Sequence, residues 1–226
     1  LLAAMLVLVA LRPLLQDRIL LRYKTVVADS LASGDLENAD MFVDKLRQLA
    51  ATQADPEVLL NCALVDQYRG NSEQAYAAIS QLAPDRIIGY GQAHLWMARH
   101  LLTESPAPNE RQLQSLMHHL QSAVHQNPDS AAAHELLGQV MMHQNQHEQA
   151  IPSLVIAAEQ NPAMHLLLAQ CYREIGASSQ AAQHLEQAEK HYLQLTSQAD
   201  CQINDFAKLA EIFVQQSQFL KAEQLL

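Results

Sequence analysis

The chain has 226 residues, of which 49% are hydrophobic and 5% aromatic, and its 14 Lys and Arg against 24 Asp and Glu give a net charge of −10. With a mean hydropathy of −0.10, this composition excludes both a polytopic membrane protein and a wholly disordered chain. The acidic balance argues against a nucleic-acid-binding protein, because such a protein needs a basic surface to displace counterions from phosphate.

The first predicted element is an apolar helix at the N-terminus. Residues 1–11 (LLAAMLVLVAL) form an unbroken apolar run that Arg12 and Pro13 interrupt. As a helix this run spans about 16 Å, roughly half of the hydrocarbon core of a bilayer. Because the chain begins with Leu1 instead of Met, we expect the run to be the C-terminal part of a longer membrane anchor. The alternatives are a secretory signal sequence and an ordinary buried helix.

The distribution of charge separates this segment from the rest of the chain. Residues 1–24 carry four basic residues and one acidic residue, a net charge of +3, whereas residues 25–226 carry 10 basic and 23 acidic residues, a net charge of −13. Basic residues behind an apolar helix favour a cytoplasmic location for the domain that follows, although one flank alone leaves the side of the membrane open. We therefore expect residues 1–19 to be the end of a single-pass anchor with its juxtamembrane segment, and residues 20–226 to form a separate domain.

This second part consists of repeated helix pairs with a constant local spacing. A turn residue is followed five residues later by an alanine in four units: Gly34 and Ala39, Gly70 and Ala75, Asn145 and Ala150, and Gly176 and Ala181. Gly and Asn enter the left-handed backbone region with the least strain, so they can end the first helix of a pair. Small residues are expected where two helices approach closely. A last unit repeats the spacing with Ser217 and Ala222, and we expect it to be truncated in its second helix.

This spacing resembles that of the tetratricopeptide repeat family, in which pairs of antiparallel helices form units of about 34 residues. The best unit, residues 131–162, contains the family's markers in order: Leu137, Gly138, Ala150, Leu154, Ala157 and Pro162. It departs from the family at His134 and Met141, where aromatic residues are usual. The resemblance implies an all-α fold of about six helix pairs over residues 20–226, stacked in a right-handed superhelix, or α-solenoid.

The two helices of the third unit are farther apart in sequence than those of the fourth unit. Ala98 and Ala123, which mark its two helices, are 25 residues apart, whereas Gly138 and Ala157 in the fourth unit are 19 residues apart. The additional residues are expected in a loop at 103–110, since the prolines there prevent a helix.

The resemblance also implies a binding surface, because in this family the inner helices line a concave groove that receives segments of partner proteins. Carried over by position, the groove residues are Leu60, Leu64 and Tyr68 in the second unit, Leu95 and Arg99 in the third, Glu135, Gln139 and His143 in the fourth, and Gln170, Arg173 and Glu174 in the fifth. Apolar residues come first and polar residues later, so the expected partner segment has an apolar anchor followed by hydrogen-bonding or acidic residues. For each single residue, the alternative is a solvated helix face.

The residues that could take part in catalysis or bind a metal form no recognisable motif. Seven of the 11 histidines lie in residues 112–172, which contain no Lys or Arg: His118, His119, His125, His134, His143, His147 and His165. Three interpretations are open, namely a metal site, a surface whose charge changes with pH, and ordinary solvated histidines. Carboxylates or cysteines that would complete a metal site are not close in sequence, so we expect no metal and no cofactor. No nucleophile elbow, phosphate loop or paired catalytic carboxylate is present, so we expect no enzyme activity.

These observations predict a scaffold that is tethered to a membrane by its N-terminal segment and acts through protein binding. The expected partner is a protein or a peptide, not a nucleic acid. Bacterial envelope proteins that serve the assembly or quality control of membrane or cell-wall complexes have this architecture, which is an analogy of architecture alone. The alternative is the regulatory or recruiting arm of an enzyme whose catalytic domain lies outside residues 1–226.

Overall fold

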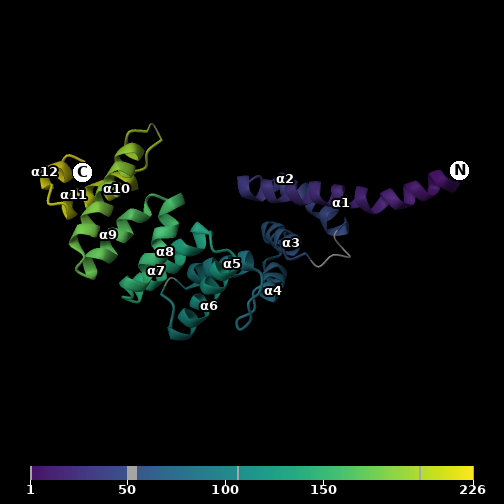
Figure 1. The fold of residues 1–226 in the computed structure, drawn as a ribbon, viewed down its shortest axis with the longest axis horizontal. Coiled ribbons are helices and arrows are strands. Elements are labelled where there is room, and N and C mark those ends of the chain that lie inside the picture. Colours follow the sequence, from purple (N-terminus) through teal and green to yellow (C-terminus); the bar gives the residue numbers. More distant parts are fainter. Residues whose placement is uncertain (1, 50–54, 106, 199, 226) are drawn as a thin grey trace. The chain divides into compact units, whose positions relative to one another are not determined.

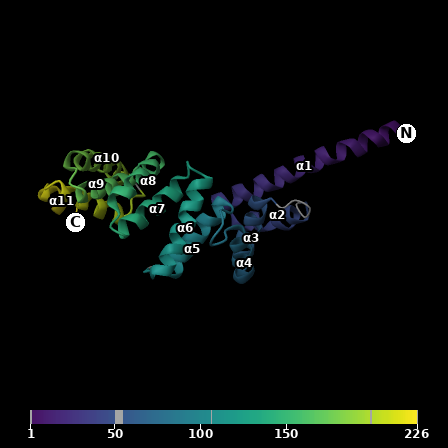
Figure 2. The same ribbon diagram turned by 60° about the horizontal axis from the view of Figure 1, so that its bottom comes forward.

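The computed structural model describes the backbone of residues 2–49, 55–105, 107–198 and 200–225, and the side chains of these ranges from residue 17 onward. Every regular element in these ranges is an α-helix (Figures 1 and 2). The helices are α1 (Leu2–Ser33), α2 (Leu36–Leu49), α3 (Pro56–Tyr68), α4 (Ser72–Leu82), α5 (Gly91–Glu104), α6 (Glu110–Gln126), α7 (Ala131–His143), α8 (His147–Gln160), α9 (Met164–Glu174), α10 (Ser178–Thr196), α11 (Ile203–Gln215) and α12 (Phe219–Glu223). The predicted all-α fold is confirmed.

The helices fall into two compact units, Leu1–Glu104 and Ser105–Leu226. The first unit contains the pairs α1–α2 and α3–α4 and the helix α5, and the second contains α6 and the pairs α7–α8, α9–α10 and α11–α12. The boundary lies in the loop that the sequence predicts at 103–110. Helices α5 and α6, which the sequence predicts as one pair, thus belong to different units, and each unit has hydrophobic cores of its own.

Turns of one kind join the helices within five of these pairs. In each turn one residue has a positive φ: Gly34 (76°), Gly70 (86°), Asn145 (58°), Gly176 (77°) and Ser217 (61°). The N–H of the next residue then donates to the carbonyl five residues earlier, with N···O distances of 2.8 Å at Asp35, 2.9 Å at Asn71, 2.9 Å at Gln146, 2.8 Å at Ala177 and 2.7 Å at Gln218. This is the hydrogen bond of a Schellman motif, which satisfies a carbonyl that the helix end leaves free. The predicted turn positions are confirmed.

Small residues occupy the contacts between paired helices. The alanines that follow the turns are buried, with exposed fractions of at most 7%: Ala39, Ala75, Ala150, Ala181 and Ala222. Gly138 of α7 lies so close to α8 that a Cβ atom added to it would be 2.6 Å from Cδ2 and 2.7 Å from Cγ of Leu154. Since real Cβ contacts are longer than this, the close packing of α7 on α8 depends on a glycine at position 138.

Ion pairs join the first three helices of the first unit. Arg69, which follows α3, binds Asp44 of α2 through two N–H groups, with Nη1–Oδ1 and Nη2–Oδ2 distances of 2.9 and 3.1 Å. The hydrogen bond to this guanidinium lowers the pKa of Asp44 below its ordinary value. The Lys24 Nζ of α1 lies 2.9 Å from Oδ2 of Asp55 and 2.6 Å from Oε2 of Glu57, at the start of α3. Because these pairs are partly exposed, they orient the helices more than they stabilise the fold.

Two histidines and a tyrosine form an aromatic cluster between α9 and α10. Nδ1 of His165 lies 3.0 Å from Nδ1 of His184, so one ring donates its Nδ1 proton to the other. The ring of His184 also stacks on Tyr172, with 5.2 Å between the ring centroids and 5° between the planes. Burial disfavours the charged form of both histidines and lowers their pKa below the ordinary value. Protonation of both rings would break the hydrogen bond between them.

No helix in the described part of the chain combines the length and the hydrophobicity that are needed to cross a membrane. Helix α1 is continuous from Leu2 to Ser33, and its N-terminal end extends beyond α2 (Figure 2). The side chains of residues 1–16, on which the predicted anchor depends, lie outside the described residues. The anchor therefore stays a prediction.

Replacing Gly138 with Ala should destabilise the second unit. The added methyl group would overlap Leu154, and overpacking of a buried site costs about 1–3 kcal/mol. This loss exceeds the gain of up to about 1 kcal/mol that Ala has over Gly inside a helix. Chemical denaturation of the two chains measures the difference. In the background Leu154→Ala, which removes the overlapping atoms, the same change should cost nothing, and an equal loss in both backgrounds would contradict the explanation.

Lowering the pH from about 7.5 to about 5.5 should reduce the free energy of unfolding through His165 and His184. Both have a lowered pKa in the folded state, so their contribution is complete above the unfolded value of about 6.5 and is lost as the pH falls below it. Urea denaturation at the two pH values measures the loss.

Two variants test whether this loss of stability comes from the cluster of His165, His184 and Tyr172. It should be smaller in His184→Phe, which keeps a ring beside Tyr172 but cannot take up a proton. It should be unchanged in His143→Gln, which alters an exposed histidine at the end of α7. The same pH dependence in all three chains would mean that other groups cause it.

Candidate binding surfaces

The predicted groove residues lie on four helices that are divided between the two units. Five are on α3 and α5 of the first unit and six on α7 and α9 of the second. The predicted residues thus fall into two sets, one in each unit.

Two residues of the first set are buried. Leu60 and Leu95 are each only 6% exposed. Leu60 belongs to a core cluster with Ala63 and Ile79, because it lies three residues before Ala63 on the same side of α3. Both leucines thus leave little surface for a partner.

The other three residues of the first set are accessible. Tyr68 is 47% exposed, Arg99 is exposed and Leu64 is half-buried. Leu64 and Tyr68 are four residues apart on α3, so they share one face of this helix. They form the apolar part of the predicted surface.

In the second set, two residues of α9 bind residues of α11. Nε2 of Gln170 donates to Oε1 of Glu211 at 3.2 Å, and Nη1 of Arg173 donates to Oε1 of Gln215 at 3.1 Å. Gln215 in turn donates to the same Glu211 oxygen at 3.2 Å, and Lys208 donates to the other one at 3.0 Å. The structure thus brings Gln170 and Arg173 into one hydrogen-bonded row with α11.

Glu211 and Gln215 are absent from the residues that the sequence predicts. The sequence does contain a signal for Glu211, because the marker residues Ala169 and Ala210 are 41 residues apart. Glu211 lies the same 41 residues after Gln170, so it occupies the equivalent position in the last unit.

The remaining residues of the second set lie at the α7 end. Oε1 and Oε2 of Glu135 accept hydrogen bonds from Gln139 at 3.3 Å and from Asn161, which follows α8, at 3.1 Å. His143 and Glu174 are exposed at the ends of α7 and α9. We call the set Glu135, Gln139, Gln170, Arg173, Glu211 and Gln215 the polar row, since its members are amides and charged groups on α7, α9 and α11.

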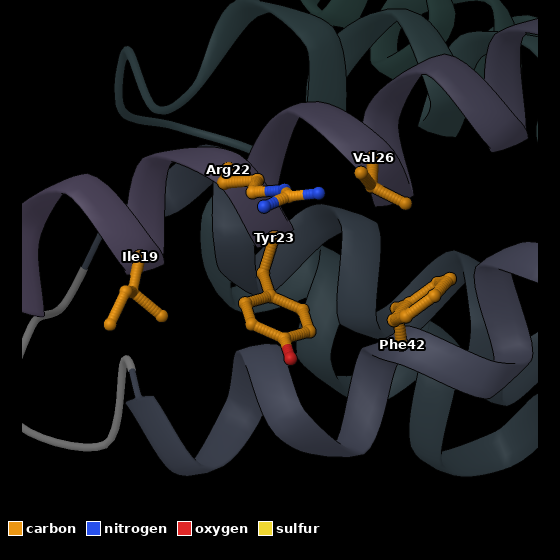
Figure 3. Close-up of a pocket in the computed structure, with 5 residues that line it drawn as sticks. All are labelled: Ile19, Arg22, Tyr23, Val26 and Phe42. Atoms are coloured by element: carbon orange, nitrogen blue, oxygen red, sulfur yellow. The ribbon is translucent and has the colours of Figure 1, made fainter.

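A surface pocket that the sequence does not predict lies between α1 and α2 (Figure 3). Its volume is about 420 Å³, and its lining residues are Ile19, Arg22, Tyr23 and Val26 of α1 and Phe42 of α2. The four residues of α1 have the spacing i, i+3, i+4 and i+7, which places them on one face of the helix.

The described residues contain no group of three or more His, Cys, Asp or Glu side chains that could hold a metal ion. Cys62 and Cys171 are buried, and burial raises the pKa of the Cys171 thiol to about 11. Since the thiolate is the reactive form of cysteine, this thiol is a poor nucleophile at neutral pH.

Neither a protein-family model nor a curated protein matches the sequence. Solved structures match the fold. A thermophilic TPR protein of Thermus thermophilus, TTC0263, has a TM-score of 0.54 and 19% identity over 86% of this chain and 99% of that chain. A crystal structure of MamA has a TM-score of 0.51 and 16% identity over 76% of this chain and 98% of that chain. At sequence identities this low, the matches show the fold alone. This fold is all-α and of the tetratricopeptide-repeat type.

Proposed function

We propose that the chain is a scaffold that binds a protein or peptide segment along the inner helices of its repeats. The polar row of the second unit carries this proposal. Its side chains are half-buried or exposed, and hydrogen bonds between neighbouring helices hold them in place. A surface whose donors and acceptors are oriented beforehand loses less side-chain entropy when a partner binds.

The chemistry of the row favours an extended or helical peptide segment. Amide groups of Gln139, Gln170 and Gln215 can each donate and accept, so they can bind the backbone of a partner. In the first unit, Leu64 and Tyr68 offer an apolar contact instead. This division agrees with a partner that has an apolar anchor in one part and hydrogen-bonding residues in another.

The proposal includes a membrane anchor at the N-terminus. Its support is the sequence: the apolar run of residues 1–11 and the basic residues Arg12, Arg18 and Arg22 behind it. With an anchor of this kind, the scaffold would serve the assembly or quality control of a complex of the cell envelope.

Removing the polar row should abolish capture of the partner. The full chain serves as bait for proteins from native membranes, beside a chain in which Gln139, Gln170, Arg173 and Gln215 are Ala. A protein that binds the row should be depleted at least tenfold in the second capture, since a few central residues carry most binding energy. A third bait with Leu64, Tyr68 and Arg99 changed to Ala tests the first unit in the same way.

The matched control is a pair on the outer helix α10. Glu186 and Lys190 form an exposed ion pair at 2.8 Å, so replacing both with Ala removes two charged side chains at constant net charge without touching the row. Captured proteins should be the same for this control and the unchanged chain. Equal capture by all four baits would contradict binding along the inner helices.

Breaking the apolar run should release the chain from membranes. Leu6→Arg and Val9→Arg together place two charges in the run, each of which costs about 2.5–3.5 kcal/mol at the centre of a membrane-spanning helix. Expressed in its natural length, the unchanged protein should stay with membranes after extraction with alkaline carbonate, and the double variant should be soluble. Recovery of the unchanged chain in the soluble fraction would contradict the anchor and leave the binding proposal unaffected.

A further inference from the structure

One face of α1 differs from the equivalent face of α3. Helix α3 packs on the α1–α2 pair through Val58, Cys62 and Val65, which share a core cluster with Val27 and Leu46. The turn residues of these two units, Gly34 and Gly70, are 36 residues apart, so the equivalent positions on α1 are Arg22, Val26 and Asp29.

These α1 positions lack the buried apolar side chains that form the contact between two repeats. Arg22 and Asp29 are exposed, whereas the equivalent Val58 and Val65 are 2% and 0% exposed. A helix pair packed here as α3 packs on α1 and α2 would bury a guanidinium and a carboxylate in an apolar contact, which is costly. The face therefore suits a different occupant.

The pocket between α1 and α2 opens on this face and has aromatic walls. The rings of Tyr23 and Phe42 lie 5.8 Å apart between centroids, with 58° between their planes. Ile19 and Val26 add aliphatic surface at either side, and Arg22 extends along α1 toward Val26 (Figure 3). A volume of about 420 Å³ is within the range of small-ligand pockets.

Arg22 is the charged group of the pocket. Within the described residues it forms no salt bridge and no hydrogen bond, whereas three other cations of the first unit are paired with carboxylates. These paired cations are Lys24, Arg47 and Arg69. A free guanidinium beside aromatic and aliphatic walls complements a ligand that has a carboxylate next to an apolar group.

We propose that the α1–α2 pocket binds a segment of a partner protein in which a large apolar side chain lies beside a carboxylate. The apolar side chain packs between Tyr23 and Phe42, and the carboxylate accepts hydrogen bonds from Arg22. An anionic membrane surface fits less well, because Lys24, one of the four basic residues of α1, is already paired with Asp55 and Glu57, and Asp17 and Asp29 lie on the same helix. The pocket shares no residue with the polar row and does not include Leu64 or Tyr68.

The first test uses a small probe with the proposed chemistry. Binding of 3-phenylpropionate and of its neutral amide to the full chain is measured by ligand-observed NMR titration. The acid should bind about two- to fivefold more tightly than the amide, as expected for one partly exposed ion pair. In Arg22→Gln the two should bind equally. The matched control Arg18→Gln removes an equal charge one turn away, outside the pocket, and should keep the preference.

A second test determines directly which side chains the pocket selects in a peptide. A random dodecapeptide library is selected on the full chain after depletion on the Arg22→Gln chain. Enrichment of Asp or Glu next to Phe, Tyr, Leu or Ile supports the proposal, and enrichment without acidic residues overturns it. Equal binding of acid and amide by the unchanged chain also overturns it.

Three further outcomes would overturn the proposal. A preference for the acid that persists in Arg22→Gln would place the site elsewhere. Dimerisation of the unchanged chain in analytical ultracentrifugation, lost in Arg22→Gln, would make a second copy the occupant. Displacement of the probe by vesicles with phosphatidylglycerol but not by phosphatidylcholine vesicles would make a lipid the occupant.

Discussion

The structure depends on a backbone turn that reverses the chain within five of its helix pairs. In each turn a residue with positive φ ends the first helix, and the next N–H satisfies a carbonyl of that helix. This geometry sets the direction of the second helix, and the buried alanine five residues later sets how closely the pair can pack. Because the same turn recurs, equivalent residues of successive first helices come into line. The hydrogen bond between Gln170 and Glu211 is a consequence of this alignment.

The turns and the small residues could be predicted because each rests on a local steric requirement. Only a few residue types tolerate positive φ, and only glycine admits Leu154 at the distance found beside Gly138. The contribution of α11 to the polar row could have been predicted too, since Glu211 lies 41 residues after Gln170, the same spacing as between Ala169 and Ala210. Leu60 could not be placed by position alone, because the side of an inner helix that faces a partner and the side that faces its own pair differ by a fraction of a turn.

The pocket was beyond prediction for a different reason. Its walls come from α1 and α2, and whether Tyr23 and Phe42 enclose a space depends on the distance between these helices. Whether Arg22 has an ion-pair partner also depends on its surroundings, and the described residues provide none. Lys24, two residues later on α1, points toward the start of α3 and is paired with Asp55 and Glu57. Two cations that are close together on one helix can therefore differ in whether they are paired. Sequence alone indicates a basic segment without showing which of its cations are paired with carboxylates.

Helix α1 connects two of the proposals, because it is continuous from Leu2 to Ser33. Leu11, the last residue of the apolar run, lies eight residues before Ile19 and 11 before Arg22, or about 12 and 16 Å along a helix of 1.5 Å per residue. An anchored chain would therefore hold the pocket just outside the headgroup region of the bilayer, which is about 5–8 Å thick on each side. A partner of the pocket would then have to present its acidic, apolar segment close to the membrane surface.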